Sequence, residues 1–267
     1  MNYKIFLADI LKKASGIANR RFGKVSGTTK AYDKNQVLTE TDIEIGNFIA
    51  ENIKKFYPTH NIIDEELGVI DHGSEYTWVV DPIDGTSNFA AGVPTYGIMM
   101  GLLHNAMPIA GGIALPYFKN ISIAEKGKGA TSDGKRITVS KEKDLIQTLI
   151  AYHWERHRED FQETREESKI VAEVVLKARN IRSSSSAFDI VMVAKGGYGG
   201  AVNQTSKIWD NVAPHILIEE AGGKYTDFFG EPMDYTHPLK KAKINFTFCA
   251  ASPRVHAQLQ KIIQKFR

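Results

Sequence analysis

The chain has 267 residues, of which 34 are Lys or Arg and 31 are Asp or Glu, so its formal net charge is +3. A hydrophobic fraction of 42% and a charged fraction of 24% are ordinary for a globular protein and exclude a disordered or low-complexity chain. The length fits one large α/β unit or two joined domains and excludes a peptide-sized binding module. The basic residues are scattered rather than gathered in a run, so nucleic acid is not an expected partner.

The cysteine count and the hydropathy pattern bear on location. Cys249 is the only cysteine, which excludes an intrachain disulfide and favours a reducing compartment. Residues 1–22 place apolar side chains at helical spacing with basic ones between them, which predicts an amphipathic helix rather than a signal peptide. The later apolar stretch 96–116 is interrupted by His104, Asn105 and several glycines and prolines, which excludes a bilayer-spanning helix there. We therefore expect a cytoplasmic protein that does not interact with membranes.

The first half of the chain mixes helices and strands. Apolar side chains on one helical face predict a helix over 42–56, with Thr41 as its N-cap. A short strand over 61–63 then runs into an acidic loop. Short apolar runs separated by Gly, Pro and Asn over 96–137 predict an antiparallel meander, with a hairpin turn at Asp133-Gly134.

The second half alternates strands and helices. Strands are expected near 148–151, 181, 201 and 244–252, and helices over 158–178, 187–194, 210–221 and 254–266. This change of pattern predicts an α+β N-terminal domain over 1–140 and an α/β C-terminal domain over 141–267. The seam between two such units is a natural ligand site.

Three separate segments place carboxylates at strand ends or helix starts. They are residues 64–66, Asp81 with Asp84, and Asp210. Any one of these acids alone is most simply a solvated loop charge. Together they form an oxygen-rich set, and proteins hold Mg²⁺ with a few carboxylates, waters and phosphate oxygens of a substrate.

The string DPIDGT favours the metal-site interpretation of these acids. A strand of β-branched residues precedes it, and Pro82 predicts that this strand stops at Asp81. Pro82 also removes one amide from the turn, so Asp81 and Asp84 can converge while the carbonyl of Ile83 faces a cation. The motif therefore predicts a cation site at the end of a strand.

The same string predicts an anion site. Gly85 and Thr86 open a predicted helix, and the free amides at the start of a helix can bind a phosphate group. A cation site beside an anion site is the arrangement that two-metal phosphoryl transfer requires, where one ion activates a water and the other stabilises the leaving oxygen.

Three ordered blocks resemble the inositol monophosphatase family, a family of magnesium-dependent, lithium-sensitive phosphomonoesterases. The blocks are DEELG at 64–68, WVVDPIDGTSNF at 78–89 and WDNVAPHILIEEAGG at 209–223, and LTETD at 38–42 and the hairpin at 125–140 also look like family features. The resemblance covers nearly the whole chain. It implies a layered α-β-α-β-α sandwich of the sugar-phosphatase type, with most metal ligands in the first domain and Asp210 and the substrate-side loops in the second. It also implies a homodimer that hydrolyses a small phosphomonoester with a metal-activated water.

The resemblance implies roles for individual residues and two or three Mg²⁺ ions in each subunit. The expected metal ligands are Glu65, Asp81, the carbonyl of Ile83, Asp84 and Asp210. The expected catalytic residues are Glu65 and Thr86, which would position and deprotonate the water, and Asp42, which would hold Thr86. The expected substrate contacts are Asp84, Gly85, Thr86, Ser186, Asn203, Lys207 and Asp210.

The substrate-side residues depart from the inositol-cleaving pattern. Asn203 stands where inositol-cleaving members usually carry a glutamate that binds substrate hydroxyls, and an amide lacks that charge. Lys207 favours a second anionic group on the substrate or is a solvated loop lysine. Ser186 binds a sugar or caps the helix that follows it, with capping slightly favoured. The basic and aromatic segment 153–158 is a specificity lid or, slightly favoured, an interface or solvated loop.

Alternatives therefore stay open. A same-fold phosphatase acting on histidinol phosphate, fructose 1,6-bisphosphate or a nucleotide phosphate fits the motifs as well as an inositol phosphatase does. From another class, the chain could be a regulatory or partner-binding protein that has kept the fold, since a fold does not guarantee an activity.

Overall fold

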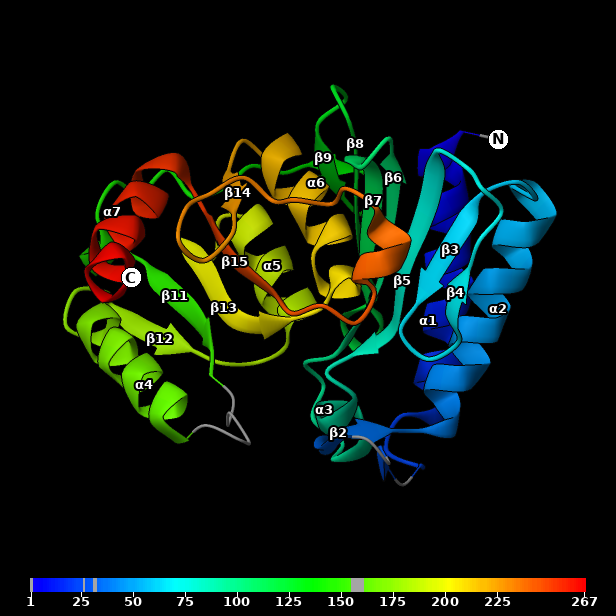
Figure 1. The fold of residues 1–267 in the computed structure, drawn as a ribbon, viewed down its shortest axis with the longest axis horizontal. Coiled ribbons are helices and arrows are strands. Elements are labelled where there is room, and N and C mark those ends of the chain that lie inside the picture. Colours follow the sequence, from blue (N-terminus) through cyan, green and yellow to red (C-terminus); the bar gives the residue numbers. More distant parts are fainter. Residues whose placement is uncertain (1, 26, 31–32, 155–160) are drawn as a thin grey trace.

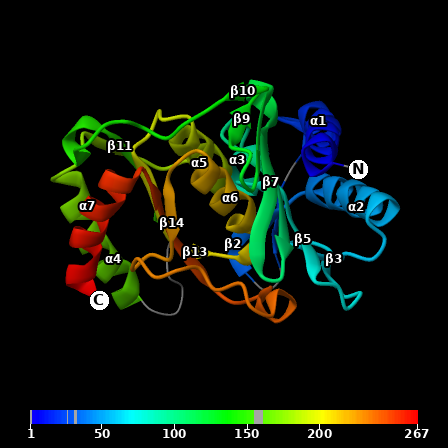
Figure 2. The same ribbon diagram turned by 90° about the horizontal axis from the view of Figure 1, so that it is seen from above.

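The computed structural model describes residues 2–25, 27–30, 33–154 and 161–267. Helices and sheets alternate as layers across the molecule, in the order helices, sheet, helices, sheet, helices (Figures 1 and 2). This arrangement confirms the predicted α-β-α-β-α sandwich. In the described part of the chain no helix is both long enough and apolar enough to cross a membrane.

Two helices form the first layer. α1 (Tyr3–Arg21) and α2 (Glu40–Phe56) bury one apolar face each against the first sheet. α2 starts two residues earlier than predicted, and its N-cap is Thr39 rather than Thr41. Thr39 has extended backbone, and it forms a capping box with Asp42, so the prediction of Thr41 was wrong. A two-stranded sheet of β1 (Thr28–Lys30) and β2 (Asp33–Leu38) links the two helices.

The first large sheet has eight strands in the order β10-β9-β8-β7-β6-β5-β3-β4. Their bounds are β3 (Asn61–Asp64), β4 (Gly68–Ile70), β5 (Tyr76–Asp84), β6 (Gly97–His104), β7 (Met107–Leu115), β8 (Asn120–Glu125), β9 (Ala130–Ser132) and β10 (Lys135–Arg136). Neighbours pair antiparallel except β3 and β5, which are parallel. The predicted hairpin turn is confirmed, since Asp133 and Gly134 both have positive φ, at 48° and 77°.

β5 differs from its prediction at the end that matters for the site. The strand continues past Pro82 to Asp84, so the prediction that it stops at Asp81 was wrong. Pairing with β6 is interrupted between Asp81 and Asp84 and resumes where Asp84 faces Gly97. The proline thus produces an irregularity rather than an end.

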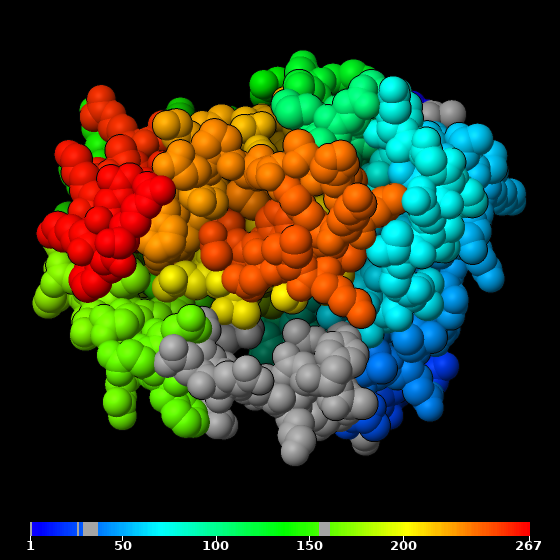
Figure 3. All heavy atoms as spheres, in the orientation of Figure 1, coloured from blue at the N-terminus to red at the C-terminus, as the bar shows by residue number. Residues whose placement is uncertain are grey.

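The second large sheet has five strands in the order β12-β11-β13-β15-β14. Their bounds are β11 (Leu149–His153), β12 (Asn180–Arg182), β13 (Gly200–Ser206), β14 (Lys224–Thr226) and β15 (Phe246–Ala251). β11 is parallel to both of its neighbours, whereas β15 is antiparallel to β13 and β14. The loop that joins β14 to β15, orange in Figure 3, lies across the face of the molecule between the C-terminal helix and the first sheet.

The remaining helices fill and cover the space around the second sheet. α5 (Ser186–Ala194) and α6 (Val212–Glu220) lie between the two sheets, and α4 (Phe161–Val175) and α7 (Pro253–Ile263) cover the outer face (Figure 2). The short helices are α3 (Thr86–Ala90), η1 (Pro116–Phe118), η2 (Leu145–Gln147), η3 (Ile208–Asp210), η4 (Pro238–Lys241) and η5 (Gln264–Phe266).

Glycines on the first sheet allow the middle layer to come close. A Cβ at Gly101 would lie 2.8 Å from the amide nitrogen of Ala213, and one at Gly111 would lie 2.9 Å from its Cα. Side chains at these positions would therefore push α6 away from β6 and β7. Because helices from the second half pack directly on the first sheet, the division into domains over 1–140 and 141–267 stays a prediction.

Candidate active site

A cavity of about 430 Å³ lies where the ends of strands from the two large sheets meet the starts of α3 and α5. Nearly all of the predicted site residues line it: Glu65, Asp81, Ile83, Asp84, Gly85, Thr86, Ser186, Asn203, Lys207 and Asp210. Asp42 is the exception, since it is buried behind Thr86. The structure thus brings together residues that are as far apart in the sequence as Glu65 and Asp210.

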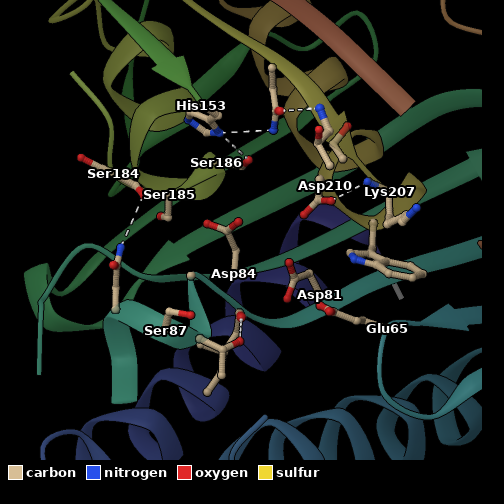
Figure 4. Close-up of a pocket in the computed structure, with 18 of the residues that line it drawn as sticks. Glu65, Asp81, Asp84, Ser87, His153, Ser184, Ser185, Ser186, Lys207 and Asp210 are labelled. Atoms are coloured by element: carbon tan, nitrogen blue, oxygen red, sulfur yellow. Dashed lines mark hydrogen bonds between the residues drawn. The ribbon is translucent and has the colours of Figure 1, made fainter. Parts of the chain in front are cut away.

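Three aspartates form the acidic centre of this cavity (Figure 4). One carboxylate oxygen from each of Asp81, Asp84 and Asp210 lies within 4.8 Å of the others. Asp81 and Asp84 come from the irregular end of β5, and Asp210 ends η3. Asp81 is 1% exposed, and its Oδ1 has no hydrogen-bond partner among the described residues. A buried oxygen of this kind is costly unless a cation occupies the site.

Backbone amides hold the other acids of the cluster. The N–H of Ala187, on α5, donates to Asp84 Oδ2 at 2.8 Å, and the N–H of Lys207 donates to Asp210 Oδ2 at 2.6 Å. Glu65 follows β3, and its loop is closed by Asp64, whose Oδ1 accepts from two backbone amides at 2.9 Å. Backbone amides therefore fix the orientation of the Asp84 and Asp210 carboxylates.

The electrostatics agree with a cation site. Burial, followed by the negative charges of Glu65, Asp84 and Asp210, raises the pKa of Asp81 well above its usual value. Burial also raises the pKa of Asp84, although the bond from the Ala187 amide opposes that shift. The donors are all oxygen atoms, which suit a hard divalent cation such as Mg²⁺ and offer no soft ligand. The residues therefore fit the predicted metal.

Thr86 and Asp42 form a pair beside the acidic centre. Thr86 Oγ1 lies 3.0 Å from Asp42 Oδ1 and 2.8 Å from the carbonyl oxygen of Ile83. Burial raises the pKa of Asp42 to about 6, against the opposing effect of hydrogen bonds from Thr39 and Thr86. The contact between Thr86 and Asp42 is the one that the sequence predicted, and it joins the capping box of α2 to the cavity.

Gly85 lies at the closest approach of the two sides of the cavity. It is the N-cap of α3 in the left-handed conformation, with φ of 78°. A Cβ there would lie 2.9 Å from the Cβ of Ser185 and 3.3 Å from the carbonyl oxygen of Thr95. Glycine is therefore required both by the backbone angle and by the space.

The substrate-side prediction needs one correction. Ser185 is the N-cap of α5, because its side chain accepts from the amide of Phe188, so capping by Ser186 was wrong. Ser186 is the first residue of the helix, and its Oγ lies 3.1 Å from His153 Nδ1. Lys207 lies at the cavity edge, where its Nζ donates to the carbonyl of Lys243 at 3.2 Å.

Sequence reasoning missed His153 as a pocket residue. The segment 153–158 is predicted to be a specificity lid, an interface or a solvated loop, but His153 ends β11 beside Asn203 of β13, and both line the cavity. Trp154 also lines it, whereas residues 155–158 lie outside the described residues. A histidine at the end of a buried strand was the available signal, but its partners come from segments too distant for any local pattern.

Comparisons with known proteins agree with this geometry. The profile of the inositol monophosphatase family matches residues 3–265. The fructose-1,6-bisphosphatase/inositol-1-monophosphatase of Aquifex aeolicus is 35% identical over 236 residues, which are 86% of this chain and 88% of that protein. The putative Nus factor SuhB of Neisseria meningitidis serogroup B is 32% identical over 243 residues, which are 90% of this chain and 88% of that protein.

A solved structure gives the same result. The inositol monophosphatase (IMPase) of Thermotoga maritima superposes with a TM-score of 0.86 at 28% identity, over 100% of this chain and 98% of that one. The family profile thus spans almost the whole chain, and the relatives match over most of their length. The chain belongs to the inositol monophosphatase family.

Proposed function

We propose that this protein is a magnesium-dependent phosphatase that hydrolyses small phosphomonoesters. The observation that carries the proposal is the buried set of Asp81, Asp84 and Asp210, which faces a cavity beside the Thr86–Asp42 pair. A buried set of carboxylate oxygens that faces a cavity is suited to hold metal ions and, through them, a phosphate group.

In this proposal two overlapping groups of ligands hold the ions. Glu65, Asp81 and the carbonyl of Ile83 would hold one ion, and Asp81, Asp84 and Asp210 a second, with a third, weaker ion on Glu65. When bound, the ions would lower the pKa of a water and offset the negative charge of the phosphate.

The chain's own residues then supply position and proton transfer. Thr86 Oγ1 can donate a hydrogen bond to Asp42 Oδ1 and accept one from a water, so that a proton taken from the water is balanced by transfer of the Thr86 hydroxyl proton to Asp42. The pKa of Asp42, raised to about 6 by burial, suits a group that is mainly ionised near neutral pH and can accept a proton during the reaction. Glu65 would orient the water from the opposite side, and the amides of Gly85 and Thr86 would bind phosphate oxygens.

An assay of phosphate release tests the proposal. The substrates are inositol 1-phosphate, fructose 1,6-bisphosphate, histidinol phosphate and adenosine 3',5'-bisphosphate, each with Mg²⁺ and with EDTA. We expect turnover that is lost on chelation and that falls about 10²–10³-fold or more in Asp84→Asn, because the cluster loses a charge that stabilises the reacting phosphate. Asp9→Asn, an exposed acid on α1, is the matched control and should retain full activity. A folded, magnesium-loaded protein that hydrolyses no phosphomonoester would contradict the proposal.

Relatives named Nus factor SuhB motivate a second candidate, a regulatory role through a partner. If the protein acts only through a partner, cells that carry Asp84→Asn should behave like cells that carry the unmodified gene. If it acts as a phosphatase, they should behave like cells from which the gene is deleted. Inhibition by lithium, homodimer formation and a cytoplasmic location also stay predictions. Phosphate release in millimolar lithium and the mass of the purified protein in solution test the first two.

A further inference from the structure

Asn211 is a buried polar residue that directly follows Asp210 of the acidic cluster. It is 0% exposed and does not line the cavity. Its Nδ2 lies 2.9 Å from Ser206 Oγ and 2.5 Å from the carbonyl oxygen of Lys207, and its Oδ1 lies 2.9 Å from the Tyr225 hydroxyl. These contacts join the end of η3 to β13 and β14, so they depend on the tertiary fold.

The directions of these hydrogen bonds follow from the groups that can only accept. The carbonyl oxygen of Lys207 carries no hydrogen, so the end of the Asn211 amide that faces it is the NH₂ group. The Oδ1 atom therefore faces Tyr225, whose hydroxyl donates. Ser206 accepts from the same NH₂ group and donates to the carbonyl of Phe246, on β15, at 2.9 Å. Both N–H groups and the oxygen of the amide thus have partners, which fixes the amide in one orientation.

Capping of α6 does not account for this side chain. Asn211 occupies the N-cap position of α6, where an asparagine side chain commonly accepts from the amides of the first turn. Here the side chain makes no capping bond, and its NH₂ group points back to Lys207 instead. The side chain of Asn211 therefore serves the segment before the helix, which is the segment that carries Asp210.

Lys207 connects Asn211 to the carboxylate of Asp210. The amide of Lys207 donates to Asp210 Oδ2 at 2.6 Å (Figure 4). The carbonyl of Lys207 accepts from the backbone amide of Asp210 at 3.0 Å and from Asn211 Nδ2. Lys207 is thus held by the carboxylate at its amide and by Asn211 at its carbonyl. A shift of the Asn211 side chain would therefore move the group that orients Asp210.

Tyr225 anchors this set of bonds to the second sheet. It is 4% exposed, and its ring stacks on those of His215 and Phe248, with centroids 4.9 Å and 5.5 Å away. These contacts give its hydroxyl a fixed position beside Asn211. Groups that orient a metal ligand from behind commonly control how tightly the metal is bound.

We propose that Asn211 is a positioning residue that is anchored to the second sheet and directs the carboxylate of Asp210 toward a metal ion in the acidic cluster. Tyr225 is a second positioning residue, since it holds Asn211. Both act through Lys207 and lie outside the cavity. The inference rests on the metal site of the proposed phosphatase and adds residues that control the affinity of that site.

Binding of Mn²⁺, which carboxylate sites accept as they accept Mg²⁺, tests the inference without turnover. Electron paramagnetic resonance measures the free ion as the folded protein is titrated. Asn211→Leu is similar in size and makes no hydrogen bond, and we expect it to weaken the affinity about tenfold. Tyr225→Phe removes only the hydroxyl, and because the contact between Asn211 and Lys207 remains, we expect a loss of about threefold.

Tyr235→Phe is the matched control. Tyr235 is 2% exposed, and its ring, like that of Tyr225, contacts His215. Its hydroxyl lies 3.2 Å from His215 Nδ1, outside the bonds of Asn211. Tyr235→Phe should therefore bind Mn²⁺ as tightly as the unmodified protein. Two tyrosine variants that both unfold at lower temperature with unchanged Mn²⁺ affinity would show that Tyr225 has only a structural role.

A second readout needs no metal. In EDTA, hydrogen exchange of the Lys207 amide, which donates to Asp210, should be faster in Asn211→Leu and Tyr225→Phe than in the unmodified protein. Unchanged Mn²⁺ affinity in Tyr225→Phe would overturn the inference even if Asn211→Leu does not fold, and it would leave the phosphatase proposal intact. Failure of the unmodified protein to bind Mn²⁺ would overturn both.

Discussion

The two walls of the cavity differ in electrostatic character. The wall from the first sheet, the charged wall, presents the carboxylates of Asp81 and Asp84 to the cavity, whereas the wall around His153, the neutral wall, presents the uncharged side chains of Ser186 and Asn203. The carboxylates of the charged wall repel one another when no ion is bound, whereas the side chains of the neutral wall lie within hydrogen-bond distance of His153. The difference separates two tasks: the charged wall suits the reaction, and the neutral wall suits recognition of the rest of the substrate.

Asp210 shows that this division does not follow the sequence. It belongs to the second half of the chain, between β13 and α6, yet its carboxylate lies within 4.8 Å of those of Asp81 and Asp84. Lys207, three residues earlier, holds it through a backbone amide. Changes in the β13 loop can therefore affect both walls, whereas changes at Thr86 or His153 affect one.

Removal of the Thr86 hydroxyl should have the largest effect and should be confined to the charged wall. We expect Thr86→Val to lower kcat about 10³-fold with Mg²⁺ binding retained, because the hydroxyl is lost from the proton-accepting pair with Asp42. The measurement is kcat for isopropyl phosphate, together with Mg²⁺ affinity from thermal shifts. Thr86→Ser keeps the hydroxyl and should retain most of the activity. Full activity in Thr86→Val would contradict the role of the hydroxyl, because valine keeps the methyl group and loses only the oxygen.

A side chain at Gly85 should act on both walls, since the two meet there. Gly85→Ala places a Cβ 2.9 Å from that of Ser185 and at a φ of 78°. We expect kcat/KM to fall about 10²-fold, because an ångström-scale displacement of the walls misaligns the phosphate.

Gly92→Ala is the matched control for the backbone strain. Gly92 has a similar φ of 73°, and a Cβ there meets nothing within 4 Å. Each alanine should lower the free energy of unfolding by about 1–2 kcal/mol, the cost of a left-handed non-glycine residue. Equal activity losses in the two variants would show that strain, rather than contact between the walls, is responsible.

The charged wall could be predicted from sequence because its chemistry is local. Asp81, Asp84 and Thr86 lie within six residues that contain a proline and a glycine, so the turn chemistry and the metal-ligand chemistry appear in one string. The same string misled about β5, because Pro82 interrupts the pairing without ending the strand. Local sequence predicts what a turn can bind better than where a strand ends.

The neutral wall could not be predicted in the same way. His153, Ser186 and Asn203 come from three segments, and each alone is an ordinary buried polar residue with a structural explanation. Their shared contact at one imidazole nitrogen depends on the parallel pairing of β11 with β13 and on the start of α5. The one-residue error at the cap of α5 had a similar cause, since Ser183, Ser184, Ser185 and Ser186 are equivalent candidates until tertiary contacts distinguish them.

The smallest predicted effect concerns the stability of the charged wall. Burial, and then the like charges around it, raise the pKa of Asp81, so Asp81→Asn should stabilise the protein in EDTA by about 1 kcal/mol, or 2–4 °C in Tm. The sign should reverse with Mg²⁺, because the unmodified protein gains about 2.7 kcal/mol at a concentration of one hundred times Kd, and a variant that lacks a ligand gains less. Thermal unfolding in EDTA and across a Mg²⁺ titration measures both terms. A variant less stable than the unmodified protein in EDTA would show that Asp81 makes a net stabilising contact without metal, and the comparison between the two walls would fail. If the free energy of unfolding of the unmodified protein rises above that of Asp81→Asn as Mg²⁺ is added, the bound ion more than offsets the repulsion among the carboxylates of the charged wall.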